Sequence, residues 1–454
     1  MITRRILIVV ALVLATLPVF SQGPESSHSK PIVITNVNVI TMENEEILQG
    51  QTVVIEDGTI TSIGRNIKPK PNSLVIDARG KWLMPGLAEM HAHVPPVDDL
   101  EPMKKVLTLF AANGITTIRG MLGHARHLEL RTMLEKGEIM GPRFYTTGPS
   151  FNGMSVTSPG AGAQMVQRQK SQGYDYLKLH PGLTRPKFDS IAITAKRVGI
   201  PFVGHVSFGV GIWRAIESGY SSIDHLDGFI EGLVPGIERR MEQEAGLFGM
   251  FVAHEADTTQ IPKLMKALKA KNIWVVPTQA LAERWFSPDF KAEDFRNDPH
   301  ARYMNSEVVD QWINSKKNLV SNPQYNRERI RSFISLRRKL IKACQDYEVG
   351  LLLGCDAPQV FNVPGFSTHQ ELVYLVRAGL TPFEALRTGT VNVATYLNIP
   401  NAGVIRAGAV ADLILVGGNP LENIEETQNV EGVILKGTWL SKEYLAGELK
   451  KLTP

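Results

Sequence analysis

Six residues with side chains suited to metal chemistry stand at the ends of short apolar segments in the middle of the chain. They are His91, His93, Lys178, His205, His225 and Asp356. Neutral imidazoles and a carboxylate are ligands that Zn²⁺ and related ions prefer. Burying these polar groups together without an ion would leave them poorly satisfied. Their types and positions therefore predict a metal site.

The lysine of this set needs a chemical explanation, because a protonated amine cannot be a ligand to a cation. Addition of CO₂ to the amine of Lys178 would give an anionic carbamate whose two oxygens can bridge two metal ions. Two ions about 3.5–4 Å apart would hold a shared hydroxide and polarise a substrate carbonyl at the same time. The residues thus predict two divalent ions, expected to be Zn²⁺, and a CO₂-derived carbamate on Lys178.

The segments that carry these residues alternate with helical patterns, which is typical of parallel strands covered by helices. Eight strands are expected, at Gly86–His91, Ile115–Arg119, Arg143–Thr147, Tyr176–His180, Pro201–His205, Ser222–His225, Ile273–Pro277 and Leu351–Asp356. Helices are expected between them, for example at Phe188–Val198 and Ile330–Tyr347, and a closing helix at Thr381–Leu397. The predicted fold class is α/β, a (β/α)₈ TIM barrel, in which the carboxyl ends of the strands form the active face.

Side-chain alternation along a strand tests whether the polar residues can converge. On the fourth expected strand, Lys178 and His180 share one face and leucines occupy the other. On the eighth strand, Asp356 faces inward, whereas Leu353 and Cys355 face outward to the helices. The connection from Trp285 to Gln324 is longer than usual, and we expect an insertion over the active face that forms a lid.

Runs rich in β-formers stand at both ends of the chain. They include Ile32–Ile34, Val37–Ile40 and Thr52–Ile55 near the start, and Ala411–Val416 and Val430–Leu435 near the end. We therefore expect residues 22–82 and 400–454 to form one composite β-sandwich domain. It would stand beside a barrel domain of residues 83–399.

Residues 1–21 have the pattern of a secretory signal peptide. Arg4 and Arg5 precede the apolar stretch Ile6–Leu17, and Val19-Phe20-Ser21 favours cleavage before Gln22. The alternative is a membrane anchor, but the stretch is shorter than the ~20 residues that span a bilayer. We expect an exported protein, periplasmic or secreted, with no stable membrane span after cleavage.

The charge balance bears on the class of partner. The formal net charge is +4, and two of the positive charges belong to the expected leader. A nearly neutral mature chain does not favour nucleic acid or an anionic membrane. A small molecule is the expected partner. The sequence leaves two alternatives for the oligomeric state, a monomer and a homo-oligomer.

The chain has only two cysteines, Cys344 and Cys355, so no disulfide framework holds the fold. The sequence leaves two alternatives open. The pair could form one bond in an oxidising compartment, or both could be small buried hydrophobes.

Taken together, the metal-binding residues resemble those of a known family. His91-Ala-His93, Asp-Tyr-Leu-Lys178-Leu, His205, His225 and Asp356 resemble the binuclear amidohydrolase superfamily, and within it the imidazolonepropionase-like, prolidase-type branch. The segments Gly114–Arg119, His369–Leu372, Leu380–Leu386 and Ala402–Leu413 add to this likeness, which covers about residues 32–440.

The resemblance implies a role for each ligand. His91, His93 and Asp356 would hold one ion, His205 and His225 the other, with carboxylated Lys178 between them. Asp356 would also take a proton from the hydroxide and pass it to the leaving amine, which is general acid–base catalysis.

One segment departs from the pattern of prolidase-like relatives, which often carry a histidine after the third strand. Here Phe151–Pro159 contains no histidine, so the sequence does not identify the group that polarises the substrate carbonyl. His180 is one candidate and a structural role its alternative, and His369 is equally ambiguous. Arg119 could meet a substrate carboxylate or form an ion pair with Glu89 inside the barrel.

The expected function is an exported, metal-dependent hydrolase of amide bonds, dipeptidase- or prolidase-like, acting on a dipeptide or an N-acyl amino acid. Alternatives are hydrolysis of another small amide, a lactam or a lactone, and a metal-retaining binding protein without turnover. A deaminase is less favoured, because mononuclear relatives do not need the lysine of the fourth strand.

The leader pattern predicts that the mature protein begins near Gln22, since the cleavage site follows Ser21. N-terminal sequencing of the protein from its native cell checks this. Recovery of an intact Met1 in the cytosol would contradict the prediction.

Overall fold

The structure is a computed structural model that describes residues 25–26 and 30–453. The expected leader and its cleavage site lie outside these residues. No helix in the described part of the chain is long and apolar enough to cross a bilayer.

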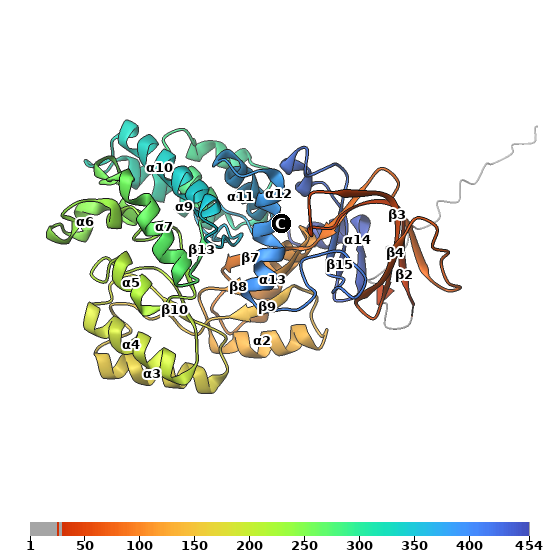
Figure 1. The fold of residues 1–454 in the computed structure, drawn as a ribbon, viewed down its shortest axis with the longest axis horizontal. Coiled ribbons are helices and arrows are strands. Elements are labelled where there is room, and N and C mark those ends of the chain that lie inside the picture. The colour runs from red at the N-terminus through yellow and green to blue at the C-terminus, as the bar shows by residue number, and fades with distance from the viewer. Residues whose placement is uncertain (1–24, 27–29, 454) are drawn as a thin grey trace, which may run out of the picture.

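Both ends of the chain contribute strands to one nine-stranded sheet, on the right in Figure 1. The first part of the chain supplies β1 (Glu25–Ser26), β2 (Ile32–Ile40), β3 (Ile47–Glu56), β4 (Thr59–Gly64), β5 (Leu74–Asp77) and β6 (Trp82–Pro85). The last part supplies β14 (Leu413–Val416), β15 (Val430–Leu435) and β16 (Thr438–Ser441). β6 joins the two groups, because it pairs in parallel with β2 and antiparallel with β14. All of these strands belong to one hydrogen-bonded sheet.

The middle of the chain forms two parallel sheets. One contains β7 (Leu87–Ala92), β8 (Ile115–Gly120) and β9 (Arg143–Thr146). The other contains β10 (Leu177–Leu179), β11 (Phe202–Gly204), β12 (Ser222–Asp224) and β13 (Trp274–Val276). Among the described residues, these strands match seven of the eight expected ones. Two parallel bridges, Thr147 to Tyr176 and Phe151 to Leu179, link the segments of β9 and β10.

The eighth expected strand, Leu351–Asp356, differs from the prediction. It makes isolated parallel bridges, Leu351 to Val275 and Ala357 to Ala92, and no continuous ladder within the described residues. One of its backbone donors is used by a side chain instead of a neighbouring strand, because Cys355 N donates a hydrogen bond to the Glu89 carboxylate at 2.9 Å. The segment still connects both parallel sheets.

Helices alternate with the parallel strands, as the sequence pattern predicts. The chain order is α1 (Leu100–Ala112), α2 (Ala125–Glu135), α3 (Pro159–Gln172), α4 (Arg185–Val198), α5 (Ile212–Ser218), α7 (Ile261–Ala270), α10 (Arg327–Asp346) and α11 (Phe366–Arg377). A final helix, α14 (Lys442–Lys451), follows the last strand. In α10, Ile330, Phe333 and Leu340 recur at helical spacing and are buried, which gives the helix its apolar face.

The closing helix, expected at Thr381–Leu397, is two helices. α12 (Pro382–Gly389) begins with a capping box between Thr381 and Glu384, and α13 (Val391–Tyr396) follows. Thr390 separates them because its backbone, with φ −127° and ψ −94°, is not helical. A continuous apolar pattern did not reveal this break.

Two long connections lie among the helices in Figure 1. The predicted insertion contains a π-helix at Ala282–Phe286, 3₁₀ helices at Ala292–Asn297 and Ala301–Tyr303, and α9 (Ser306–Val320), and it packs against Phe361. The second, between β12 and α7, was not predicted. It contains short helices at Glu231–Leu233, Ile237–Arg239, Glu242–Ala245 (α6), Leu247–Gly249, Ala253–Glu255 and Thr258–Gln260.

One glycine marks close packing between the terminal sheet and the parallel sheets. Gly114 has φ +73°, and a Cβ there would lie 2.2 Å from Cδ1 of Ile414. Gly114→Ala should therefore destabilise the fold by about 1–3 kcal/mol through overpacking, beyond the backbone cost. The measurement is the urea unfolding midpoint.

Gly137→Ala is the matched control, because Gly137 has φ +71° and open space around the position of a Cβ. The Gly137→Ala variant should lose only the stability that the left-handed backbone conformation costs an alanine. Equal losses of stability in both variants would show that the contact with Ile414 is not tight.

Candidate metal centre

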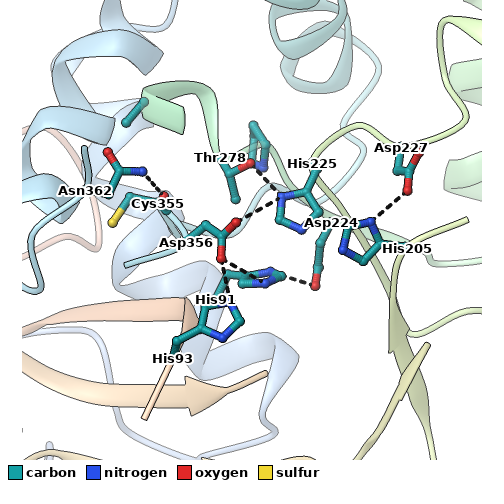
Figure 2. Close-up of polar contacts among 12 residues, drawn as sticks. His91, His93, His205, Asp224, His225, Asp227, Thr278, Cys355, Asp356 and Asn362 are labelled. Atoms are coloured by element: carbon teal, nitrogen blue, oxygen red, sulfur yellow. Dashed lines mark hydrogen bonds and ion pairs between the residues drawn. The ribbon is translucent and has the colours of Figure 1, made fainter. Parts of the chain in front are cut away.

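The carboxylate of Asp356 lies at the centre of a group of histidines (Figure 2). Its Oδ1 is 2.6 Å from His93 Nε2 and 3.4 Å from His91 Nε2. Its Oδ2 is 3.9 Å from His225 Nδ1. Ligand atoms of His91, His225 and Asp356, all buried, lie within 4.8 Å of one another. Donors of this type at this spacing fit a metal ion.

The cluster continues from His225 toward His205. The ring centroid of His225 is 4.4 Å from that of His91 and 4.5 Å from that of His205. Lys178 is fully buried beneath these rings, with its Nζ 3.4 Å from His91 Nε2. The fold therefore brings all six predicted metal residues into one group.

A carboxylate or hydroxyl oxygen lies beside Nδ1 of three of the histidine rings, and for His205 and His225 the contact is a hydrogen bond. Asp224 Oδ2 is 3.0 Å from His91 Nδ1, and Asp227 Oδ2 is 2.9 Å from His205 Nδ1. Thr278 Oγ1, the third partner, is 2.9 Å from His225 Nδ1. Such partners hold the rings of metal-binding histidines in place and leave Nε2 for the ion.

These three orienting residues were missed by the sequence analysis. Asp224 and Asp227 flank His225 in the string Asp-His-Leu-Asp, and acidic residues around a metal-binding histidine are a usable signal. Thr278 had no such signal, because it lies 53 residues from the histidine that it contacts.

Left-handed backbone places three of the site residues. His225 has φ +64°, Thr278 +47° and Asp356 +68°. For residues other than glycine this conformation costs of order 1–2 kcal/mol each, so surrounding contacts must enforce it. Buried Arg337 holds the backbone at two of them, since it donates to the carbonyl of His225 at 2.6 Å and to that of Pro277, next to Thr278, at 2.7 Å.

Burial favours the neutral form of His91, His180, His205 and His225. Desolvation lowers the pKa of His91 and His225 well below the usual range, and the charge of Lys178 adds to the effect. The pKa of His205 falls to about 3 and that of His180 to about 2 for the same reasons. Neutral imidazoles have the free lone pair that a metal ligand needs.

His180 lies at the rim of the cluster. It is half-buried, and its ring centroid is 5.0 Å from that of His205. It is therefore close enough to the second histidine pair to contact a molecule bound there.

Arg119 is fully buried on the inner side of the cluster. Its guanidinium donates to Met90 O at 2.8 Å, to the Tyr396 hydroxyl at 2.9 Å and to Asp224 Oδ1 at 3.3 Å. The carboxylate that it pairs with is Asp224 rather than Glu89. In this arrangement Arg119 supports the partner of His91.

Two other residues singled out from the sequence have structural surroundings. His369 is buried, with Nε2 2.9 Å from Asn113 O and Nδ1 3.0 Å from Thr427 Oγ1, so both ring nitrogens are satisfied away from the cluster. Cys344 and Cys355 both lie in the described part of the chain and are free, buried thiols. The alternative in which they pair is not realised.

Comparison with known proteins places this chain in a family. The family model named Amidohydrolase family matches residues 82–440. The ochratoxinase of Aspergillus niger is 22% identical over 460 residues, which cover 92% of this chain and 88% of that enzyme. The 5′-deoxyadenosine deaminase of Methanosarcina acetivorans is 40% identical over 106 residues, only 23% of this chain and 19% of that enzyme's length.

Solved structures show the same fold at low sequence identity. A putative prolidase from Bifidobacterium longum has a TM-score of 0.68 and 20% identity, and the match covers 93% of this chain and 99% of that one. A Xaa-Pro dipeptidase with bound methionine has a TM-score of 0.65 and 20% identity, with 91% and 100% covered. Since the family model spans most of its length, this chain belongs to the amidohydrolase family.

Proposed function

We propose that this chain is an exported hydrolase that uses two divalent metal ions to cleave the amide bond of a dipeptide or N-acyl amino acid, as a prolidase-like enzyme does. One observation carries the proposal. Buried Lys178 touches a cluster of four histidines and an aspartate, within 3.4 Å of His91 Nε2. The proposal of export rests on the leader pattern of residues 1–21.

The donor set supports a pair of ions. His91, His93 and Asp356 would hold one, and His205 and His225 the other. Zn²⁺ suits neutral imidazoles and a carboxylate. When bound, the ions would polarise the amide carbonyl and lower the pKa of water, which makes a nucleophile near neutral pH.

A carbamate on Lys178 would complete the site between the two groups. Burial lowers the pKa of this lysine to about 8, which raises the fraction of neutral amine. The neutral amine is the form that adds CO₂. The added negative charge would offset the positive charge of the ions in a buried place.

Asp356 is the residue that moves a proton in this proposal. Its two oxygens face different histidines, Oδ1 toward His93 and Oδ2 toward His225, so it borders both ligand groups. A carboxylate in this place can accept the proton of the attacking water and deliver it to the leaving amine. His180, at the rim, is our candidate for contact with the substrate carbonyl.

The proposal includes a closed (β/α)₈ barrel as the support of the site. Segment 351–357 hydrogen-bonds with β13 through Leu352 N, with β7 through Met90 N, and with the residue that follows β7 through His93 N. Such bonding on both sides is what the eighth strand of a barrel requires.

Deamination is a second candidate, favoured by the 40% identity to a deaminase over part of the chain. Lys178 distinguishes the two, because a mononuclear deaminase site has no need of a bridging group. The direct test is a library of dipeptides and N-acyl amino acids, with lactams, lactones and adenosine derivatives, assayed on metal-reconstituted protein. Turnover of none of them by the fully metallated protein would favour a metal-retaining binding protein.

The bridging role predicts that purified protein contains about two divalent ions per chain and that Lys178→Ala loses both, because both share its carbamate. Elemental analysis measures this. Lys316→Ala is the control, since Lys316 is also buried but donates to Arg284 O and Ser287 O in the insertion. One ion in the wild type, unchanged in Lys178→Ala, would contradict a binuclear site.

The proton-transfer role predicts that Asp356→Asn keeps most of its metal and loses about 10²–10⁴-fold in turnover, because the amide cannot accept the proton. The measurement is kcat at matched metal content. His225→Asn serves for comparison, since it should act by lowering occupancy of the second ion. Near-normal turnover by metallated Asp356→Asn would show that another group moves the proton.

A further inference from the structure

A cavity of about 710 Å³ adjoins the histidine cluster. It lies between residues 206–213, which follow β11, and residues 227–248 of the connection that the sequence did not predict. Asp227 lines the cavity and contacts His205, and Phe248 lines it and stacks on His225 with ring centroids 5.2 Å apart. A substrate at the cluster could therefore extend into this cavity.

Much of the cavity wall is apolar. The apolar side chains include Val206, Phe208, Ile212, Trp213, Val234 and Leu247. A hydrocarbon stem placed here would leave water for an apolar surface, which is favourable.

The charged groups of the wall are mostly acidic. Asp227, Glu231, Glu238 and Glu242 line the cavity, and Arg185 is the basic side chain among its lining residues. Charge complementarity therefore favours a cation as the occupant.

Among these acidic residues, Glu231 gives the clearest indication of a bound cation. It is 9% exposed, and its Oε2 is buried without a hydrogen-bond partner among the described residues. Arg337 is the nearby buried cation, but it donates to His225 O, Pro277 O and Gln279 Oε1 instead. A buried carboxylate without a partner is costly, so it marks a place where a ligand can supply the missing donor.

The glycine at position 249 lets the backbone approach Glu231 closely. A Cβ there would lie 2.9 Å from Cγ2 of Ile230 and 3.1 Å from Cδ of Glu231. Burial and the neighbouring Asp227 raise the pKa of Glu231 to about 8, so the group is mostly protonated at neutral pH without a counter-ion. A bound cation would favour its ionised form.

We propose that this cavity binds a cationic part of the substrate, an ammonium or guanidinium on an apolar stem, and that Glu231 determines this specificity. The inference rests on the proposed amide hydrolysis for its substrate class. Two parts of a peptide substrate carry such a group, the side chain of lysine or arginine and the α-ammonium.

The first test is binding to metal-loaded protein without turnover. n-Pentylamine and n-pentanol serve as probes that share the stem and differ in charge. The amine should raise the Tm of the wild type more than the alcohol does, and Glu231→Gln should abolish the difference. Glu217→Gln is the control, because Glu217 is an exposed carboxylate of α5 that pairs with Arg214 outside the cavity.

The second test is kinetic and uses dipeptides with lysine or norleucine at either position, each with a free or an acetylated amino terminus. We expect the wild type to favour one cationic form by at least about tenfold in kcat/KM, and Glu231→Gln to lose that preference. A preference for lysine that survives acetylation assigns the side chain to the cavity, and one that acetylation removes assigns the α-ammonium.

The outcomes separate this inference from the proposed function. Protection by pentylamine without cleavage of any amide supports the cation site and contradicts amide hydrolysis. Cleavage of amides without preference for charge, and equal effects of amine and alcohol, would overturn the cation site and leave the hydrolase in place. A charge preference that is unchanged in Glu231→Gln, with metal content and Tm intact, would overturn the role of Glu231.

Discussion

The carboxylate of Asp356 contacts histidines that come from two different parallel sheets. His91 lies on β7 of one sheet, and His225 follows β12 of the other. Asp356 contacts both side chains from a segment that bridges to Ala92 on one side and Val275 on the other. The position of the histidines, and with it the site, depends on this segment holding its carboxylate between the sheets.

Burying so many polar groups at one place requires a second layer of partners. Asp224 lies beside His91 Nδ1 and accepts a hydrogen bond from Arg119. Arg337 donates to the backbone carbonyl of His225. Charged groups in the interior are costly unless they are paired and hydrogen-bonded. Arg119 and Arg337 are both fully buried, so they support the site residues from the interior and are not placed to contact a substrate at its entrance.

The two sides of the cluster differ in a way that bears on substrate choice. On the inner side, Arg119 donates to Met90 O, to the Tyr396 hydroxyl and to Asp224 Oδ1. On the side of His205, the wall opens into a cavity where Glu231 has an oxygen without a partner. The proposed cation site lies on this second side, whereas Arg119 supports the first.

The sequence by itself determined the positions of seven parallel strands and the residue types of the cluster, because strand alternation and ligand chemistry are local properties. Alternation alone would put Asp224 and His225 on opposite faces of β12, yet both reach the site because His225 has φ +64°. That turn is enforced by Arg337, 112 residues away. The break at Thr390 and the cavity beside Glu231 were likewise decided by tertiary contacts. No local pattern encodes a left-handed residue or a cavity wall when the groups that enforce them come from distant parts of the chain.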